Sequence, residues 1–269
     1  MNIKRDFYLQ QLIDRRENGM VKVICGLRRS GKSFLLFNLF KGYLLQDGVK
    51  ENQIISLSLD EDVNDKYRDP AVLSEYIRSC MRDSREMYYL FLDEIQFAIS
   101  REELGNNDKP VRLYGMLNGL MHLGNIDIYV TGSNSKMLSK DVLTEFRGRG
   151  DVVNVSPLSF REYYGYVGGD RVIAFEDYAR YGGMPLCLSK KDEFAKSSYL
   201  IGLFDEVFHN ELRHIKARAL ITVRIVLLRC SALEFEFYLL VLVKINGDSS
   251  GALADLIVAR YRVDKAGRV

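Results

Sequence analysis

The sequence predicts an α/β fold in which a parallel five-stranded sheet carries helices on both faces and a small helical domain follows it. Three observations support this fold class. Apolar runs of strand length alternate with helically spaced apolar residues through the first 155 residues. The run Tyr88–Leu92 is apolar throughout, as expected of a strand that is buried on both faces. From Pro157 onward, glycine-punctuated helical segments replace this alternation.

Each element of the first 155 residues follows from periodicity and turn signals. Strands are expected at residues 20–25, 54–59, 88–92, 126–130 and 152–155. Helices are expected directly after residue 33, at about 71–82 behind the turn signal Asp69-Pro70, and at 111–123. Because a helix separates consecutive strands, each new strand can run in the same direction as the last, which makes the sheet parallel.

The change of pattern divides the chain into three regions. We expect the sheet core over residues 1–155, a helical domain over 156–215 and a tail over 216–269. In the helical domain, PLSFREYYGYV, FEDYARYGG and residues 192–215 have the pattern of short helices. The tail loses a clear amphipathic pattern after about Lys216, so we expect a truncated or frame-altered C-terminal region of unassigned fold. Mass spectrometry that finds Val269 as the terminus of a stably folded native protein would contradict this expectation.

Composition excludes several classes of protein. The 269 residues include 38 basic and 36 acidic side chains, and the net charge of +2 demands neither nucleic acid nor an anionic membrane. The four cysteines are far apart, which favours reduced thiols over a disulfide frame or a zinc site. The N-terminus has no signal-peptide core, and the apolar stretch 219–243 contains two arginines and two glutamates that oppose membrane insertion. We therefore expect a cytoplasmic protein with no membrane partner.

The segment GLRRSGKS, residues 26–33, matches the phosphate-loop pattern G-x-x-x-x-G-K-[ST] without a mismatch. It lies between an apolar strand and a helix, which is the context that phosphate binding requires. Gly26 and Gly31 let the backbone bend so that N–H groups converge on phosphate oxygens, and the helix N-terminus adds partial positive charge. Lys32 is expected to reach the β and γ phosphates, and the Ser33 hydroxyl to bind Mg²⁺. The expected nucleotide-binding residues here are Gly26, Ser30, Gly31, Lys32, Ser33 and Phe34.

Two acids, Asp93 and Glu94, directly follow the apolar run YYLFL. The C-terminal ends of parallel strands share one edge of the sheet, so Asp93 is expected beside the phosphate loop. Asp93 would hold the hydration shell of Mg²⁺, and Glu94 would orient and polarise the water that attacks the γ phosphate. An acidic pair after a strand is also common at the start of a helix, but its combination with the phosphate loop favours the metal site.

The motifs favour ATP as the nucleotide and hydrolysis as the reaction. A GTPase would need an Asn-Lys-x-Asp element and an Asp-x-x-Gly switch, and the sequence supplies neither. Kinases of small molecules usually lack a glutamate directly after the metal-binding acid. The pair of acids therefore predicts an Mg²⁺-dependent ATPase.

Two later segments could complete the catalytic site. Ser133 and Asn134 follow the next strand and could bond the γ phosphate or the attacking water, although Gly-Ser-Asn could equally be a simple turn. Arg147 or Arg149, in FRGRG, could stabilise the charge of phosphoryl transfer, often from a neighbouring subunit. An exposed turn would explain these two arginines as well.

GLRRSGKS, FLDEIQ, TGSNSKML, FRGRG, SPLSFREYY and YGGMP occur in an order and at spacings that resemble a bacterial and archaeal family of AAA-superfamily ATPases. This family is related to the archaeal and signal-transduction P-loop NTPases and carries a poorly characterised C-terminal domain. The likeness covers about residues 1–215, and members usually run considerably longer.

The resemblance implies roles for individual residues. It makes Gly26, Gly31, Lys32 and Ser33 the Walker A loop, and Asp93 with Glu94 the Walker B pair. Ser133 or Asn134 corresponds to the sensor position. Pro185, in Gly183-Met184-Pro185, is similar to the proline that signal-transduction ATPases place against the nucleotide base from a helical lid.

Two functions from different classes remain open at this point. The first is a cytoplasmic ATPase that couples ATP and Mg²⁺ to movement of the helical domain as a lid. The second is a nucleotide-gated module with little or no hydrolysis that binds DNA or a partner protein. A homo-oligomer is expected if the arginine is supplied by a neighbouring subunit.

Overall fold

The structure, a computed structural model, describes residues 3–100, 102–103, 111–132, 149–212, 220–227, 239–246 and 258–259. The chain forms two compact units. The first comprises Met1–Leu158 and Gly182–Ser189, and the second comprises Ser159–Tyr181 and Lys190–Val269. The chain therefore leaves the first unit after Leu158, returns to it at Gly182 and leaves it again after Ser189.

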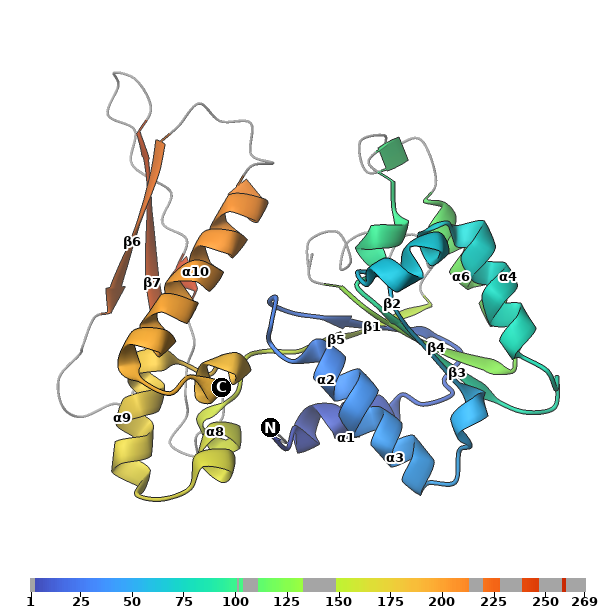
Figure 1. Cartoon of the computed structure of the whole chain (residues 1–269), viewed down its shortest axis with the longest axis horizontal. Helices are drawn as coiled ribbons and strands as arrows, with labels where there is room; N and C mark the ends of the chain where they lie inside the picture. The colour runs from blue at the N-terminus through green and yellow to red at the C-terminus, as the bar shows by residue number, and fades with distance from the viewer. Residues whose placement is uncertain are drawn as a thin grey trace. The chain divides into compact units, whose positions relative to one another are not determined.

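A five-stranded parallel sheet forms the centre of the first unit (Figure 1). In spatial order its strands are β2 (Ile54–Ser58), β3 (Tyr88–Asp93), β4 (Ile126–Thr131), β1 (Val21–Cys25) and β5 (Gly150–Asn154). Each neighbouring pair of strands is parallel, so the loops that follow β1, β3 and β4 leave the sheet at the same edge. The predicted strands are confirmed, with boundaries that differ by one or two residues.

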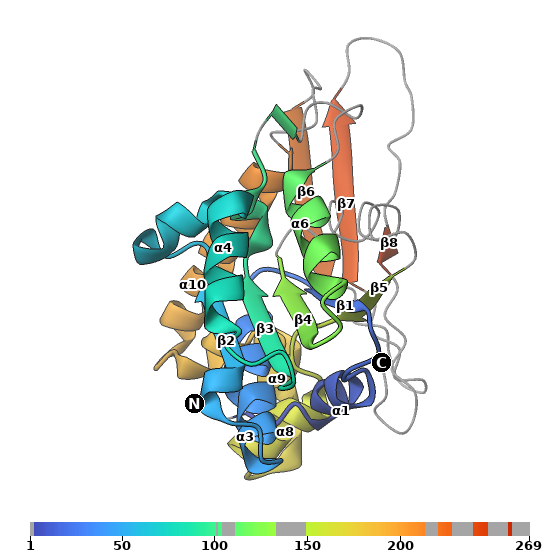
Figure 2. The same cartoon turned by 90° about the vertical axis from the view of Figure 1, so that its right-hand side faces the viewer.

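Helices cover both faces of this sheet (Figures 1 and 2). The helices of the first unit are α1 (Asp6–Asp14), α2 (Lys32–Phe34), α3 (Lys41–Gln46), α4 (Pro70–Cys80) and α6 (Arg112–Met121). A π-helical turn, η1 (Leu35–Phe40), joins α2 to α3 in one continuous helix, and short 3₁₀ turns lie at η2 (Glu51–Gln53), η3 (Asp62–Arg68), η4 (Ile95–Ala98) and η5 (Pro185–Ser189). The predicted fold class, an α/β P-loop fold with helices on both faces, is thereby confirmed.

The alternation of side chains along the buried strands builds two separate cores. Leu90 and Leu92 of β3 pack with α4 and α6 on one face. Phe91 of β3 and Tyr129 of β4 point to the other face, where they pack with Phe40 in the helix that follows the phosphate loop. Both faces of the central strands are therefore closed to water. The C-terminal ends of the strands, where the loops begin, are the place where a ligand can bind.

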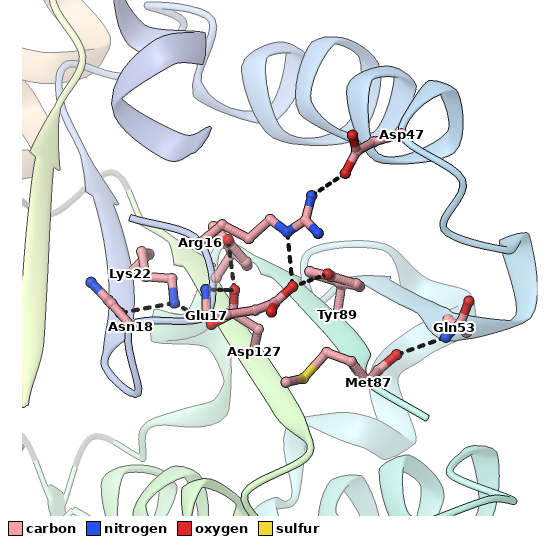
Figure 3. Close-up of polar contacts among 10 residues, drawn as sticks. Arg16, Glu17, Asn18, Lys22, Asp47, Gln53, Met87, Tyr89 and Asp127 are labelled. Atoms are coloured by element: carbon pink, nitrogen blue, oxygen red, sulfur yellow. Dashed lines mark hydrogen bonds and ion pairs between the residues drawn. The ribbon is translucent and has the colours of Figure 1, made fainter. Parts of the chain in front are cut away.

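A buried polar cluster lies at the N-terminal ends of β1 and β4 (Figure 3). Lys22, whose side chain is fully buried, forms an ion pair with Asp127, and its ammonium also donates to Asn18 Oδ1 at 3.2 Å. Asp127 accepts further hydrogen bonds from the Tyr129 hydroxyl at 2.8 Å and from the Glu17 backbone N–H at 2.9 Å. The cluster fixes the turn that leads into β1.

The second unit begins with helices whose ends carry recognisable caps. Ser159 and Glu162 form a capping box at the start of α8 (Phe160–Val167). α9 (Arg171–Tyr181) packs against α8 through rings, with the Phe160 and Phe175 centroids 5.1 Å apart. α10 (Glu193–Leu212) is joined to α9 by ion pairs, including Lys196 with Asp177 at 2.6 Å. These helices match the helical pattern expected from Pro157 onward.

Beyond α10, three strands form an antiparallel sheet: β6 (Leu220–Leu227), β7 (Leu239–Asn246) and β8 (Val258–Ala259). Among the described residues, no helix is both long enough and apolar enough to span a bilayer. Of the four cysteines, the three that the structure describes are free thiols.

Candidate functional site

The phosphate loop connects the buried strand β1 to the N-terminus of α2, at the edge where the parallel strands end. The loop turns through three residues in the left-handed backbone region, Gly26 (φ +145°), Arg29 (φ +65°) and Gly31 (φ +97°). Glycine adopts this region without strain, whereas Arg29 is strained there, and such strain is most often held at functional sites. Backbone turns of this kind can form concave N–H sites that bind anions.

Gly26 is required by close packing as well as by its backbone angle. A Cβ placed on Gly26 would overlap the carbonyl oxygen of Val155, the first residue after β5. The Val155 N–H in turn donates to the Cys25 carbonyl at 2.7 Å. The start of the loop is therefore pressed against the chain that leaves β5.

Lys32 is the buried cation of the site. Its residue is 4 % exposed, and its ammonium donates to the carbonyl oxygens of Gly26 at 3.1 Å and Leu27 at 3.0 Å. Burial lowers the pKa of Lys32, while the nearby carboxylates of Glu94 and Asp93 act in the opposite direction. The ammonium thus lies within the curve of the loop, near Asp93 and Glu94 at the end of β3.

Asp93, the last residue of β3, meets the phosphate loop from the neighbouring strands. It is 6 % exposed, and its carboxylate accepts a hydrogen bond from the Thr131 hydroxyl at the end of β4. The Ser33 hydroxyl at the start of α2 lies near enough to lower the pKa of Asp93. Burial raises the pKa of Asp93 above its ordinary value, and the charges of Glu94 and Asp60 add to this rise. The nearby Lys32 ammonium offsets part of this buried negative charge.

Glu94 follows Asp93 in the left-handed backbone region, with φ +52° and ψ +52°. Its N–H donates to Thr131 Oγ1 at 3.2 Å, and its carboxylate accepts from Gln96 Nε2. The strained turn directs Glu94 away from the path of the strand at the point where the sheet ends.

Thr131 and Arg5 are the two residues of this region that the sequence analysis missed. The Thr131 hydroxyl contacts both members of the acidic pair, and its position as the last residue of β4 is the signal that could have found it. Arg5 donates to the carbonyls of Ser30 at 3.0 Å and Ser156 at 2.7 Å, but nothing in the residues around Arg5 indicates contacts so distant in sequence.

Some of the remaining predicted residues lie at or near the phosphate loop, and others lie outside the described residues. Ser30 is fully buried in the loop, and the Cγ of Pro185 lies 3.8 Å from where a Cβ on Gly31 would be. Phe34 is half-buried in α2. Three others lie outside the described residues: Ser133, Asn134 and Arg147.

Arg149 lies where the strands begin, at the opposite end of the sheet from the phosphate loop. Its carbonyl accepts from the N–H of Val21, the first residue of β1, and Gly150 is in register with Val21. The phosphate loop begins five residues later, roughly 16 Å along the strand. The Arg149 backbone therefore lies at the opposite end of the strands from the phosphate loop of its own chain, and a role for Arg149 at the phosphate stays a prediction.

Comparison with known proteins agrees with this geometry. The family model described as "AAA domain" matches residues 18–164, more than half of the chain. The chain belongs to this AAA domain family. The matched residues include the phosphate loop, the acids Asp93 and Glu94 and the whole parallel sheet, so the family likeness rests on the part of the molecule that builds the site.

Two curated relatives match the chain over more than 200 residues each. An uncharacterized protein of Haemophilus influenzae is 33 % identical over 217 residues, which cover 79 % of this chain and 51 % of the relative. An uncharacterized protein of Methanocaldococcus jannaschii is 29 % identical over 218 residues, covering 73 % of this chain and 44 % of the relative. The chain spans about half the length of the curated relatives it matches.

Among solved structures, the Walker-type ATPase PABY2304 of Pyrococcus abyssi is similar in fold. It has a TM-score of 0.51 at 16 % identity, with 80 % of this chain and 76 % of that chain covered. The likeness supports the P-loop ATPase fold of the AAA domain.

The donor set at the edge of the AAA domain fits a nucleotide with Mg²⁺. Ser33 and Asp93 offer a hydroxyl and a carboxylate oxygen, which are hard oxygen donors of the kind that Mg²⁺ prefers. Lys32 and the left-handed turns of the loop offer the positive charge and N–H groups for phosphate.

Proposed function

We propose that this AAA domain is a cytoplasmic, Mg²⁺-dependent ATP hydrolase that couples its nucleotide state to a change of conformation in its helical region. The observation that carries the proposal is the meeting of the phosphate loop with Asp93: the Ser33 hydroxyl lies near enough to lower the pKa of this carboxyl, and the Lys32 ammonium lies near its charge. The first turn after the phosphate loop and the end of a separate strand therefore lie together, at the position where a bound metal ion and the γ phosphate would meet.

Each residue of the site has a task in hydrolysis. Lys32 exchanges the carbonyls of Gly26 and Leu27 for oxygens of the β and γ phosphates. Ser33 and Asp93 hold the Mg²⁺ and its water shell. When bound, the Mg²⁺ neutralises charge that develops on the phosphate oxygens. Glu94 orients the attacking water and accepts its proton.

A contact to the nucleotide base and a sensor residue complete the nucleotide site in this proposal. Pro185 lies near Gly31, which supports a contact between this proline and the nucleotide base. Ser133 or Asn134 follows Thr131 by two or three residues and would bond the γ phosphate or the attacking water. The absence of an Asn-Lys-x-Asp element from the sequence favours ATP over GTP.

The helical region, residues 156–215, would act as a lid. The chain runs from the first unit into the second and back at Leu158 and Gly182, close in sequence to residues that pack against the phosphate loop. Binding and hydrolysis at the loop would therefore bias the conformation of the segments that lead into the lid.

Arg147 or Arg149 would act on the phosphate site of a neighbouring subunit. The place of Arg149 at the far edge of the sheet supports supply to another chain over supply to its own. We expect light scattering to detect a larger assembly with ATP than without it. A monomer in both conditions would contradict the intersubunit role.

Phosphate release, followed with malachite green, tests the hydrolase itself. Turnover should be lost in Lys32→Ala, whereas Lys41→Ala, which removes a lysine nine residues later on the same helix, should retain it. Glu94→Gln should bind ATP but stop hydrolysis. Turnover that survives Lys32→Ala would reject the proposal. Binding by the wild type without any turnover would favour the alternative, a nucleotide-gated module for DNA or a partner protein.

A further inference from the structure

Arg5 reaches the phosphate loop from the start of α1, and its guanidinium binds backbone carbonyls of the protein. The residue is 3 % exposed, and its guanidinium stacks over the ring of Tyr8 at 4.6 Å. One terminal nitrogen, Nη1, donates to the Ser30 carbonyl at 3.0 Å, and the other, Nη2, donates to the Ser156 carbonyl at 2.7 Å. These two carbonyls belong to segments 126 residues apart in sequence, and a single planar cation fixes the spacing between them.

The Ser156 peptide is held from both sides by the first turn of α1. Arg5 binds its carbonyl, and the Tyr8 hydroxyl accepts a hydrogen bond from its N–H at 3.1 Å. Ser156 lies two residues before the chain enters the second unit after Leu158. The outgoing segment, residues 155–158, is therefore attached to the N-terminal helix as well as to the sheet.

The segment that returns from the second unit is attached to the same place. The Leu158 N–H donates to the Gly183 carbonyl at 2.7 Å, and a Cβ on Gly183 would overlap the Leu158 carbonyl. A Cβ on Gly31 would lie 3.6 Å from Arg5 Nη1 and 3.8 Å from Pro185 Cγ. Gly31 is therefore flanked by Arg5 and by the returning segment.

We infer that Arg5 is a positioning residue that fastens the phosphate loop to the outgoing segment 155–158 and, through it, to the returning segment 182–187. A shift of the Ser30–Gly31 peptide when phosphate binds would move the guanidinium, and the guanidinium would move Ser156. The inference rests on the proposed nucleotide binding, because it states how that event reaches the second unit. Lysine cannot replace this function, since its single ammonium lacks the planar pair of donors that bridges two fixed carbonyls.

Hydrogen exchange with mass spectrometry, with and without Mg²⁺ and the non-hydrolysable analogue AMP-PNP, tests this inference. In the wild type, we expect AMP-PNP to slow exchange in the loop and in both segments. Arg5→Lys should bind the analogue within about tenfold of the wild type and keep the protection of the loop. It should lose more than half of the protection in residues 155–158 and 182–187. Tyr8→Phe, which removes the acceptor for the Ser156 N–H, should reduce the protection of 155–158 in part.

Arg15→Met is the matched control. Arg15 lies just after α1 and pairs with Asp151 of β5 at 2.9 Å, so this variant removes an attachment of the N-terminal helix without touching the loop. It should respond to AMP-PNP as the wild type does. Wild-type protection of both segments in Arg5→Lys would overturn the inference, as would an equal loss in Arg15→Met. Failure of the wild type to bind AMP-PNP would instead refute the proposed function, and the coupling with it.

Discussion

Thr131 joins two strand ends of the phosphate site through one hydroxyl group. The hydroxyl donates to Asp93 and accepts from the Glu94 N–H, so it orients the carboxylate assigned to the metal and holds the turn that carries the assigned base. The sequence pattern predicts the polar contribution of this strand at Ser133 and Asn134. Thr131 does not stand out in this pattern, because a threonine inside an apolar strand is compatible with an ordinary β-branched core residue.

Replacing Thr131 should weaken the use of Mg²⁺ more than the fold. In Thr131→Val, which keeps the shape and removes the hydroxyl, we expect the Mg²⁺ concentration for half-maximal hydrolysis to rise about tenfold or more, because the carboxylate that we propose binds the metal loses its orienting partner. Thr131→Ser restores the hydroxyl and should return to within a fewfold of the wild type. A Thr131→Val enzyme with an unchanged Mg²⁺ dependence would contradict this role.

Gly26 should tolerate no side chain. Gly26→Ala adds a Cβ that overlaps the Val155 carbonyl in addition to a left-handed φ, so we expect loss of ATP binding together with destabilisation. Gly48→Ala is a control for the backbone angle alone, because Gly48 has φ +94° and nothing within 4 Å of its Cβ position. It should cost about 1–2 kcal/mol in urea unfolding and leave ATP binding unchanged. Equal effects of the two substitutions would disprove the packing argument.

At the scale of elements, the positions of the strands were predictable from the sequence, whereas the polar contacts between strands were not. Runs such as YYLFL are apolar on both faces because helices cover both sides of the sheet, and this pattern survives in the sequence. Lys22 interrupts the apolar run of β1 in the sequence, yet it is fully buried because Asp127 of β4 compensates its charge. A single sequence does not indicate which distant acid a buried lysine will meet.

The ion pair between Lys22 and Asp127 should be costly to break from one side. Asp127→Ala leaves the buried ammonium without its carboxylate, and we expect a loss of about 3–5 kcal/mol in the free energy of unfolding. The double variant Lys22→Met/Asp127→Ala removes the uncompensated charge and should be more stable than Asp127→Ala alone. Urea denaturation of the three proteins measures the difference. A double variant that is the least stable of the three would show that the charge is not the cause.

Glu17 should contribute stability that depends on pH. Its carboxylate accepts from the Tyr89 hydroxyl and pairs with Arg16, and these contacts lower the pKa of Glu17 below its ordinary value of 4.5 (Figure 3). The stabilisation is therefore present above pH 4.5 and is lost as the pH falls through the folded-state pKa.

Denaturation of the wild type and Glu17→Gln at several pH values measures this contribution. We expect the wild type to be more stable by about 0.5–1 kcal/mol at neutral pH, since the pair is partly exposed, and the gap should close in acid. Glu51→Gln, at an exposed carboxylate paired with Lys41, should show a smaller difference. A gap for Glu17→Gln that widens in acid would reverse the assigned sign.

At the scale of the whole molecule, the order of segments in sequence hides how they divide in space. The sequence predicted a continuous helical region from residue 156, whereas Gly182–Ser189 groups with the sheet and the phosphate loop. This return depends on contacts such as Leu158 with Gly183, which are made by backbone atoms and leave no pattern in side chains. The strands β6, β7 and β8 were likewise not predicted, because their segments lack a clear amphipathic period.

Nucleotide binding should stabilise the first unit as a whole. A ligand at one hundred times its Kd adds about 2.7 kcal/mol to the free energy of unfolding if it binds only the folded state. We expect urea unfolding of the wild type with Mg²⁺ and AMP-PNP to show this shift, and Lys32→Ala to show none. A comparable shift in Lys32→Ala would mean that the analogue binds elsewhere.

The convergence of Ser33 and Asp93 on one metal ion is tested most directly by electron paramagnetic resonance of Mn²⁺ in place of Mg²⁺. With AMP-PNP present, the wild type should bind one Mn²⁺ per chain, and Ser33→Ala and Asp93→Asn should each weaken binding by about tenfold or more. Without nucleotide the affinity should fall sharply, because Mg²⁺-like ions rely on phosphate oxygens as well as protein groups. Mn²⁺ binding that is indifferent to both substitutions would show that the two segments do not share a metal site.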